Sequence, residues 1–333
     1  MTSGADSFDL YNAGKGVAMA SEDMKKISII GAGVMGADIG LEFARFGYRV
    51  AMQDLSEEFL QKAMGVVAED LGLMVETGLI TEEEARKATS NISTTTDMEE
   101  CAKGSWHVLE AVPEVLEIKQ QVLAQLDEIC PADVSIASNT SSLRIDECAA
   151  KAEKYPERIL TIHYWQPAHL IPLVEVICGS KTSTEMKDRC ASMLRGLRKR
   201  VVIQDKELST VPVGWGNAMQ WTLGEKAKSL VDEGCPPQIV DDLIRFGFGR
   251  RLAFTAWFYR VDMNGIGMAF KTAKSRGIKL WGPYQELADR GDFGMASGKG
   301  FYDWSGNKAK DFLREFNLEL IHLLKRDMER GDI

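Results

Sequence analysis

Residues 25–55, KKISIIGAGVMGADIGLEFARFGYRVAMQDL, contain the pattern from which the fold of the chain is predicted. A short apolar run that ends at Ile30 is followed by three glycines in the spacing Gly-x-Gly-x-x-Gly, and then by apolar residues at helical spacing. Gly47 is placed to end that helix, and a second apolar run leads to Asp54. Strand, glycine-rich turn, helix, strand and acidic residue, in this order, form the full fingerprint of a dinucleotide-binding unit.

Each glycine of this motif has a distinct predicted role. Gly31 permits a tight turn, Gly33 lets the backbone approach a pyrophosphate, and Gly36 allows the helix to pack closely on the strand. The N-terminus of the helix offers free N–H groups and the positive end of its dipole to the phosphates. The alternative interpretation is a tight turn that binds no ligand. The residues predicted to contact the phosphates are Gly31, Gly33, Val34, Met35 and Gly36.

The acidic residue after the second strand predicts which dinucleotide binds. The carboxylate of Asp54 can accept hydrogen bonds from an adenosine ribose, but it would repel the 2′-phosphate of NADP. Leu55 follows it, and no arginine stands beside it in the sequence. We therefore expect NAD as the cofactor.

The remainder of the chain predicts two domains of different class. Up to about residue 205, short apolar runs alternate with helical segments, which indicates an α/β fold with a parallel sheet. After Leu208, long helical stretches follow with few strand signals. We expect strands at 25–30, 48–53, 107–112, 134–139, 159–164, 173–178 and 200–204. The expected divisions are a flexible leader (1–24), a Rossmann-type NAD-binding domain (25–207) and an all-helical second domain (208–333).

Composition and charge restrict the class of partner. The 333 residues are 45% hydrophobic and 27% charged, with a net charge of −9, which is typical of a globular protein. No long basic stretch provides the electrostatic footprint of a nucleic-acid-binding protein. No apolar stretch approaches the ~18 residues that would suggest a membrane helix. We expect a small-molecule substrate, with neither nucleic acid nor a membrane as partner.

The cysteines and the one basic cluster add little chemistry. The six cysteines show no Cys-x-x-Cys pair and no metal-ligand grouping, so the sequence predicts no metal site. Reduced thiols favour a cytoplasmic location. A cluster of four basic residues is predicted to be a solvated helix end, with a phosphate contact as the alternative. Its members are Arg195, Arg198, Lys199 and Arg200.

The stretch 161–176, TIHYWQPAHLIPLVEV, contains the candidate catalytic base. The segment between His163 and Pro172 is shorter than the roughly twelve residues of a parallel crossover, so the flanking strands should pair antiparallel and place Glu175 across the turn from the histidine. A carboxylate at one ring nitrogen fixes the tautomer and raises the basicity of the other. Beside a bound nicotinamide, such a pair can take an alcohol proton while hydride leaves the same carbon. The alternative is a histidine that closes a buried strand with one hydrogen bond.

Two further polar features fit such a site. Ser-Asn-Thr-Ser-Ser at 138–142 follows a predicted strand, and parallel sheets bind their ligands at the carboxyl ends of strands. Asn217 stands at the entry to the second domain. Serine and asparagine commonly cap helices at such places, so capping is the alternative role for both features.

Six motifs in this order resemble the L-3-hydroxyacyl-CoA dehydrogenase family over residues 25–305. They are GAGVMG, EAVPE (110–114), ASNTSS (137–142), HYWQPAHLIPLVEV, the segment ending in Asn217, and SGKGFYDW (297–304). The superfamily also contains gulonate and carnitine dehydrogenases and lambda-crystallins. The resemblance implies an NAD-dependent oxidoreductase of fatty acid metabolism that interconverts a 3-hydroxyl and a 3-keto group, and a helical domain that forms a homodimer.

The resemblance also implies roles for individual residues. His163 would be the catalytic base and Glu175 its partner, while Ser141 and Asn217 would contact the substrate oxygen. Gln166 replaces the asparagine that the family usually has three residues after the histidine. The residues expected near the cofactor are Glu114, Lys119, Asn139 and Gln166.

Other departures concern the substrate. Where the family offers a serine and a lysine to the CoA moiety, the matching positions are Asp70 and Thr77, and an acidic residue is a poor partner for CoA phosphates. FGFGRRLAF (246–254) resembles a Gly-x-Gly-x-Arg segment of the gulonate and carnitine dehydrogenases. Arg251 would then hold a free carboxylate of the substrate; otherwise it is a surface arginine. The alternatives to an acyl-CoA dehydrogenase are a dehydrogenase of a short hydroxy acid, a non-catalytic NAD-binding structural protein, and a reductase of the 6-phosphogluconate-dehydrogenase type.

Overall fold

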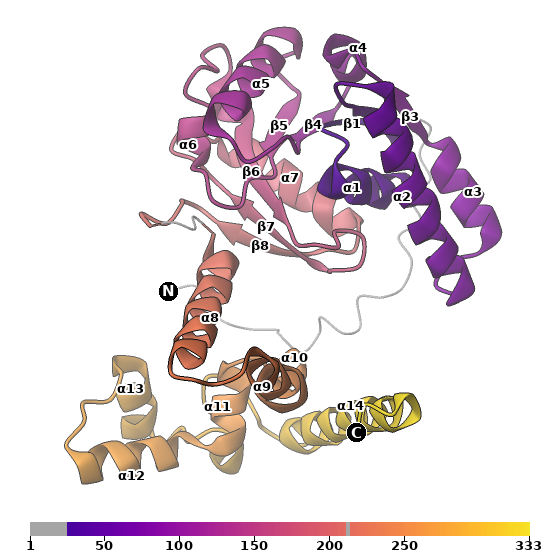
Figure 1. Ribbon diagram of the computed structural model, residues 1–333. Helices are drawn as coiled ribbons and strands as arrows, with labels where there is room; N and C mark the ends of the chain where they lie inside the picture. Colours follow the sequence, from indigo (N-terminus) through magenta and orange to yellow (C-terminus); the bar gives the residue numbers. More distant parts are fainter. Residues whose placement is uncertain (1–24, 211–213) are drawn as a thin grey trace. The chain divides into compact units, whose positions relative to one another are not determined.

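The computed structural model describes residues 25–210 and 214–333, so the predicted leader at 1–24 lies outside the described residues. The chain divides into two compact units, one that ends at Thr222 and one from Leu223 to Ile333. The first is an α/β unit and the second is helical, which confirms the predicted fold class (Figure 1). Among the described residues, no helix combines the length and apolar character needed to cross a bilayer.

A mostly parallel sheet forms the centre of the first unit. Its strands lie in the order β3-β2-β1-β4-β5-β6-β7-β8. The β6–β7 pair is antiparallel and the other pairs are parallel, so β7 and β8 run opposite to the other strands. Their bounds are β1 Lys26–Ile30, β2 Arg49–Gln53, β3 Ile92–Thr95, β4 His107–Glu110, β5 Ser135–Ser138, β6 Ile159–Tyr164, β7 Leu173–Ile177 and β8 Arg200–Gln204. All seven predicted strands are confirmed. The strand that the sequence did not predict, β3, is a half-exposed edge strand with the sequence Ile-Ser-Thr-Thr.

Helices cover both faces of this sheet (Figure 1). On β1, Ile27 and Ile29 pack in one apolar cluster with α1 and α2, whereas Ile30 packs in a second cluster with α4 and α5. Successive strand side chains point to opposite faces, so this division follows from the strand geometry. The helices are α1 Val34–Arg45, α2 Glu57–Glu76, α3 Glu82–Ser90, α4 Met98–Ala102, α5 Leu116–Ile129, α6 Ile145–Cys148, η2 Pro156–Arg158 and α7 Thr184–Gly196.

The second unit contains only helices and short bridges. Buried Asp262 organises it, because its carboxylate accepts hydrogen bonds from the backbone of Phe301 and Tyr302 and from the indole N–H of Trp304. The helix α8 begins in the first unit and ends in the second. The bounds are α8 Trp215–Asp232, α9 Pro237–Asp242, η3 Leu243–Phe248, α10 Gly249–Thr255, α11 Phe258–Asn264, α12 Ile266–Arg276, α13 Gly282–Arg290, η4 Met295–Ser297 and α14 Lys308–Arg330.

The prediction that the basic cluster at 195–200 is solvated is wrong for Lys199. Lys199 is buried, and its Nζ donates hydrogen bonds to the carbonyl oxygens of Ala168 (2.7 Å) and Ile171 (3.0 Å). The same nitrogen lies 2.8 Å from a carboxylate oxygen of Glu42 on α1. A buried ammonium needs a carboxylate and several acceptors, and Lys199 has both. It therefore fastens the β6–β7 loop to α1.

Candidate active site

The glycine-rich turn leaves the N-terminus of α1 open. Gly31 has a φ of 95°, and a Cβ there would clash with the backbone of Ala111 on the neighbouring strand's extension. At Gly36 a Cβ would collide with the carbonyl oxygen of Gly31. Gly33, the N-cap residue, has no side-chain cap, and a Cβ there would meet no atom within 4 Å. Its backbone therefore faces open space, where a phosphate can reach the free N–H groups of the helix.

A cavity of about 590 Å³ lies at this end of the sheet, within the usual range for a small-molecule site. Asp54 stands in its wall and is tied to the glycine-rich turn, because one carboxylate oxygen accepts the N–H of Ala32 at 2.7 Å. The other oxygen accepts the N–H of Leu55 at 2.7 Å. The cavity is lined by Ile30, Gly31, Gly33, Val34, Met35, Gln53, Asp54, Leu55, Phe59, Met98, Ala111, Val112, Pro113, Ile118 and Val122.

Strand pairing brings His163 and Glu175 together. The two residues stand directly opposite each other in the antiparallel β6–β7 ladder, so their side chains lie on the same face of the sheet. The Nδ1 atom of His163 lies 2.9 Å from Oε2 of Glu175. The side chains are 6% and 2% exposed, which removes competing water from this contact. The antiparallel pairing predicted from the short loop is confirmed.

The other ring nitrogen of His163 faces two polar groups. Ser141, in the loop after β5, places its Oγ 3.2 Å from Nε2. Asn217, in the first turn of α8, places its Nδ2 3.3 Å from Nε2 and donates to the carbonyl oxygen of Ser141 at 3.1 Å. With the Nδ1 proton directed to Glu175, the lone pair of Nε2 points to the side where Ser141 and Asn217 converge.

Glu175 is held as an ionised carboxylate. Burial alone would raise its pKa, but hydrogen bonds from His163 and from the backbone N–H of Gly216 outweigh burial and leave the pKa below its ordinary value. The Gly216 bond measures 2.9 Å. The indole of Trp165 packs edge-on against the His163 ring, with centroids 5.6 Å apart. The imidazole is therefore fixed in orientation from two sides.

Comparison with known proteins gives the family of the chain. Residues 26–208 match the family described as 3-hydroxyacyl-CoA dehydrogenase, NAD binding domain, and residues 215–304 match its C-terminal domain. The chain belongs to the 3-hydroxyacyl-CoA dehydrogenase family. The predicted family and its cofactor, NAD, are thereby confirmed.

Several relatives within the 3-hydroxyacyl-CoA dehydrogenase family resemble the chain. It is 30% identical over 290 residues to a probable 3-hydroxybutyryl-CoA dehydrogenase of Bacillus subtilis, covering 85% of this chain and 98% of the relative. It is 29% identical over 294 residues to 3-hydroxyadipyl-CoA dehydrogenase of Escherichia coli, covering 86% of this chain but only 60% of the relative. The solved 3-hydroxyacyl-CoA dehydrogenase of Archaeoglobus fulgidus is 26% identical, with a TM-score of 0.74, and the match covers 90% of this chain and 99% of that one.

Glu114 and Lys119, which the resemblance places near the cofactor, both bind other protein groups, and Glu114 is exposed. One oxygen of Glu114 accepts the N–H groups of Ser141 (2.9 Å) and Ser142 (2.8 Å), and so shapes the loop that carries Ser141. Lys119 is buried, and its Nζ lies 2.8 Å from Glu110 and 3.4 Å from Glu114. Burial acts to raise the pKa of Glu114, but hydrogen bonds from Thr140 and Ser142 and the charge of Lys119 lower it below its ordinary value.

Glu110 lies at the site but was not predicted from the sequence as one of its residues. It is fully buried at the end of β4, and it accepts hydrogen bonds from Lys119 (2.8 Å), Ser138 (2.6 Å) and the N–H of Val112 (2.7 Å). It thus joins β4, β5 and α5 at the edge of the sheet where the site lies. The signal was present, since a glutamate ends an apolar run in the motif EAVPE.

The remaining predicted residues lie in three different settings. Asn139 accepts the N–H of Tyr164 at 2.9 Å, which ties the loop after β5 to the end of β6. Gln166 is exposed and precedes Pro167 through a cis peptide bond. Arg251 lies on α10 in the second unit, is partly exposed and has no ion pair with another described residue. Its neighbour Arg250, by contrast, pairs with buried Asp327.

Proposed function

We propose that this chain is an NAD-dependent oxidoreductase that interconverts a 3-hydroxyl and a 3-keto group on an acyl-CoA thioester. One observation carries the proposal. His163 has a buried carboxylate, Glu175, at one ring nitrogen, and at the other nitrogen it faces the side chains of Ser141 and Asn217. That arrangement is the one that general acid–base catalysis at an alcohol requires.

The residues at the glycine-rich turn fit the cofactor that the family implies. Gly33 presents backbone to open space beside the uncapped N-terminus of α1, and Asp54 holds a carboxylate in the wall of the adjoining cavity. A ribose hydroxyl can donate to that carboxylate, whereas a 2′-phosphate would be repelled by it. NAD, when bound, accepts the hydride that leaves the substrate carbon.

The protein's own residues move the proton and stabilise charge. In the oxidation direction, Nε2 of His163 takes the proton of the 3-hydroxyl while the C–O bond becomes a carbonyl. Glu175 stabilises the resulting imidazolium through Nδ1, 2.9 Å away. The hydroxyl of Ser141 and the amide N–H of Asn217 donate hydrogen bonds to the substrate oxygen as its negative charge develops. In the reduction direction the imidazolium returns the proton to that oxygen.

A histidine variant with a matched control tests this function. We expect His163→Gln to lower kcat for acetoacetyl-CoA reduction by about 10²–10⁴-fold, followed by NADH absorbance, while NADH affinity stays near that of the wild type. His322→Gln is the control, because His322 is 67% exposed on α14 in the second unit. If His163→Gln turns over substrate as fast as the control, the assignment fails. Tight NADH binding by the wild type with no activity on any hydroxy acid would instead favour the non-catalytic alternative.

The acyl tail separates the main proposal from a dehydrogenase of a free hydroxy acid. Arg251 makes no ion pair with another described residue, so its guanidinium remains open to a carboxylate. Comparing acetoacetyl-CoA with short free hydroxy acids, in the wild type and in Arg251→Ala, distinguishes them. We expect CoA esters to be turned over and the substitution to leave that activity unchanged. Selective loss of free-acid turnover in Arg251→Ala would support the alternative.

We also propose a homodimer through the second unit, in the cytoplasm. The apolar side chains of α14 support the dimer, because they recur at helical spacing and remain more than one third exposed in the single chain, whereas Asp327 is the buried residue of this helix. Light scattering on Ile321→Asp tests it, since a charge on that surface should yield monomers. The exposed apolar residues of α14 are Leu313, Leu318, Ile321, Leu324 and Met328.

The free state of all six cysteines supports the proposed cytoplasmic location.

A further inference from the structure

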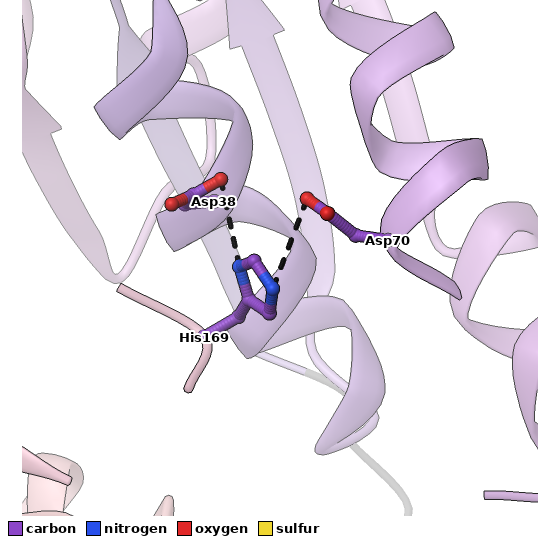
Figure 2. Close-up of side chains that lie close together, drawn as sticks. All are labelled: Asp38, Asp70 and His169. Carbon is purple, nitrogen blue, oxygen red and sulfur yellow. Dashed lines mark ion pairs between the residues drawn. The ribbon is translucent and has the colours of Figure 1, made fainter. Parts of the chain in front are cut away.

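Two aspartates and a histidine meet away from the site described above. Asp38 lies on α1, Asp70 lies on α2, and His169 lies in the loop between β6 and β7. Figure 2 shows the imidazole ring pointing between the two carboxylates. Nδ1 of His169 is 3.5 Å from Oδ1 of Asp38, and Nε2 is 3.8 Å from Oδ2 of Asp70. Both separations exceed the 2.7–3.2 Å of a direct N–H···O hydrogen bond.

The polar atoms of this cluster are shielded from water but incompletely paired. The side chains of Asp38 and His169 are 3% and 4% exposed, and that of Asp70 is 19% exposed. Within the described part of the chain, Nδ1 of His169 and Oδ2 of Asp70 are buried atoms without a hydrogen-bond partner. Asp38 has one further bond, from the N–H of Ala168 at 3.0 Å. Leaving buried polar atoms unpaired is energetically costly, so these two atoms point to a ligand.

The charges around the cluster favour a cation. The neighbouring cations Arg45 and Lys199 are both paired with Glu42, at 3.2 and 2.8 Å. In the described residues, the ion pairs of Asp38 and Asp70 are made with His169 alone. Two carboxylates so placed repel each other unless positive charge lies between them.

We propose that Asp38, Asp70 and one ring nitrogen of His169 bind a divalent transition-metal cation. One ligand atom from each residue lies within 4.8 Å of the other two, so a central point is at most about 2.8 Å from all three, against ~2.0–2.2 Å in a formed site. A closure of about half an ångström per ligand brings them into range, with water completing the coordination. One imidazole and two carboxylates suit Zn²⁺ or Mn²⁺ better than Mg²⁺, which prefers oxygen ligands.

Such a cation would join α1, whose N-terminus faces the cofactor cavity, to α2 and to the loop that follows β6. Lys199 already fastens that loop to α1 through the carbonyl oxygens of Ala168 and Ile171. The cation site stands apart from the proposed catalytic residues, and it does not depend on the reaction they perform.

Binding of Zn²⁺ and Mn²⁺ to untagged, chelator-treated full-length protein tests the proposal. Isothermal titration calorimetry on the wild type is expected to show one equivalent bound per chain, with Mg²⁺ binding at least tenfold more weakly. Asp70→Asn should weaken the Zn²⁺ affinity at least tenfold, because it removes one ligand charge and keeps the side-chain shape. Glu69→Gln is the matched control, since it removes the same charge from an exposed position one residue away on α2 and should bind as the wild type does.

The change in melting temperature on adding Zn²⁺ provides a second readout, which remains informative if a variant is less stable than the wild type. Added Zn²⁺ should raise the melting temperature of the wild type and of Glu69→Gln, and excess chelator should reverse the rise. The proposal is overturned if the wild type binds no cation, or if Asp70→Asn and Glu69→Gln bind it equally.

Discussion

Replacing Gly216 by alanine should disturb the proposed catalytic pair through one added methyl group. A Cβ at this position would lie 2.6 Å from Cζ2 of Trp165 and 3.1 Å from both carboxylate oxygens of Glu175. Carbon atoms in contact prefer about 3.5–4.0 Å, so Trp165 or the first turn of α8 must move by roughly 1 Å. That indole packs edge-on against His163, and the movement also strains the hydrogen bond from Gly216 to Glu175.

A shift of this size sets the expected loss of activity. Misplacing catalytic groups by about 1 Å can cost ~10²-fold in rate, so we expect Gly216→Ala to lower kcat/KM for acetoacetyl-CoA reduction by up to about that factor. The hydrogen bond from Gly216 is one of those that lower the pKa of Glu175, so its loss should move that pKa upward. The affinity for NADH should not change, because Gly216 is absent from the lining of the cofactor cavity.

Gly224→Ala, in the same helix, is the matched control. A Cβ at Gly224 meets no atom within 4 Å, and alanine is about 1 kcal/mol more favourable than glycine inside a helix. Gly224→Ala should therefore keep its stability and activity, so a loss confined to Gly216→Ala reports the contact with Trp165 and Glu175. Steady-state kinetics and a pH–rate profile of both variants provide the measurement. A kcat/KM for Gly216→Ala within about twofold of the control would refute the reasoning.

Three further perturbations test other parts of the first unit. Asp54→Ala should raise the Kd for NADH by roughly 10–150-fold, because it removes a charged hydrogen bond that contributes ~1.5–3 kcal/mol to binding. Fluorescence titrations with NADH and NADPH should also show that the variant discriminates less between the two cofactors. Lys119→Met leaves the buried carboxylate of Glu110 unpaired and should destabilise the unit by about 3–5 kcal/mol in urea unfolding, whereas an unchanged midpoint would show that the pair is dispensable. Glu114 has a lowered pKa, so its contribution to stability is present above the ordinary carboxyl value of ~4.3 and is lost as pH falls through the folded value. Glu114→Gln should therefore melt below the wild type at pH 7, with the gap closing below about pH 4, and a gap independent of pH would contradict this.

Local sequence pattern was sufficient for seven of the eight strands and for the pair of His163 and Glu175. The short segment between His163 and Pro172 leaves an antiparallel return as the geometric solution, and that return sets His163 opposite Glu175. Gly31 and Gly36 each stand where backbone atoms leave no room for a side chain. The short turn and the spacing of the glycines are local in the chain, which is why spacing could predict both features, although the atoms that crowd Gly31 belong to distant Ala111.

Features that depend on distant segments escaped prediction. The strand β3 carries Ser and Thr on a half-exposed edge, so it has no apolar run to identify it. From the sequence, Lys199 was predicted to be a solvated surface residue. Its buried position depends on Glu42, far earlier in the chain, whose carboxylate lies 2.8 Å from the lysine Nζ. The cluster around His169 arises from three separate segments, and its residue types have no ligand-like spacing in the sequence.

The β6–β7 ladder has a consequence for how enzymes of this design can diversify. His163 and Glu175 are aligned by strand register, and the register of a hairpin is set by the turn that joins its strands. A turn of different length could slip the pairing by one residue and carry Glu175 to the other face of the sheet, away from the histidine. Apart from Trp165, which packs on the imidazole, the composition of this turn can therefore change more freely than its length.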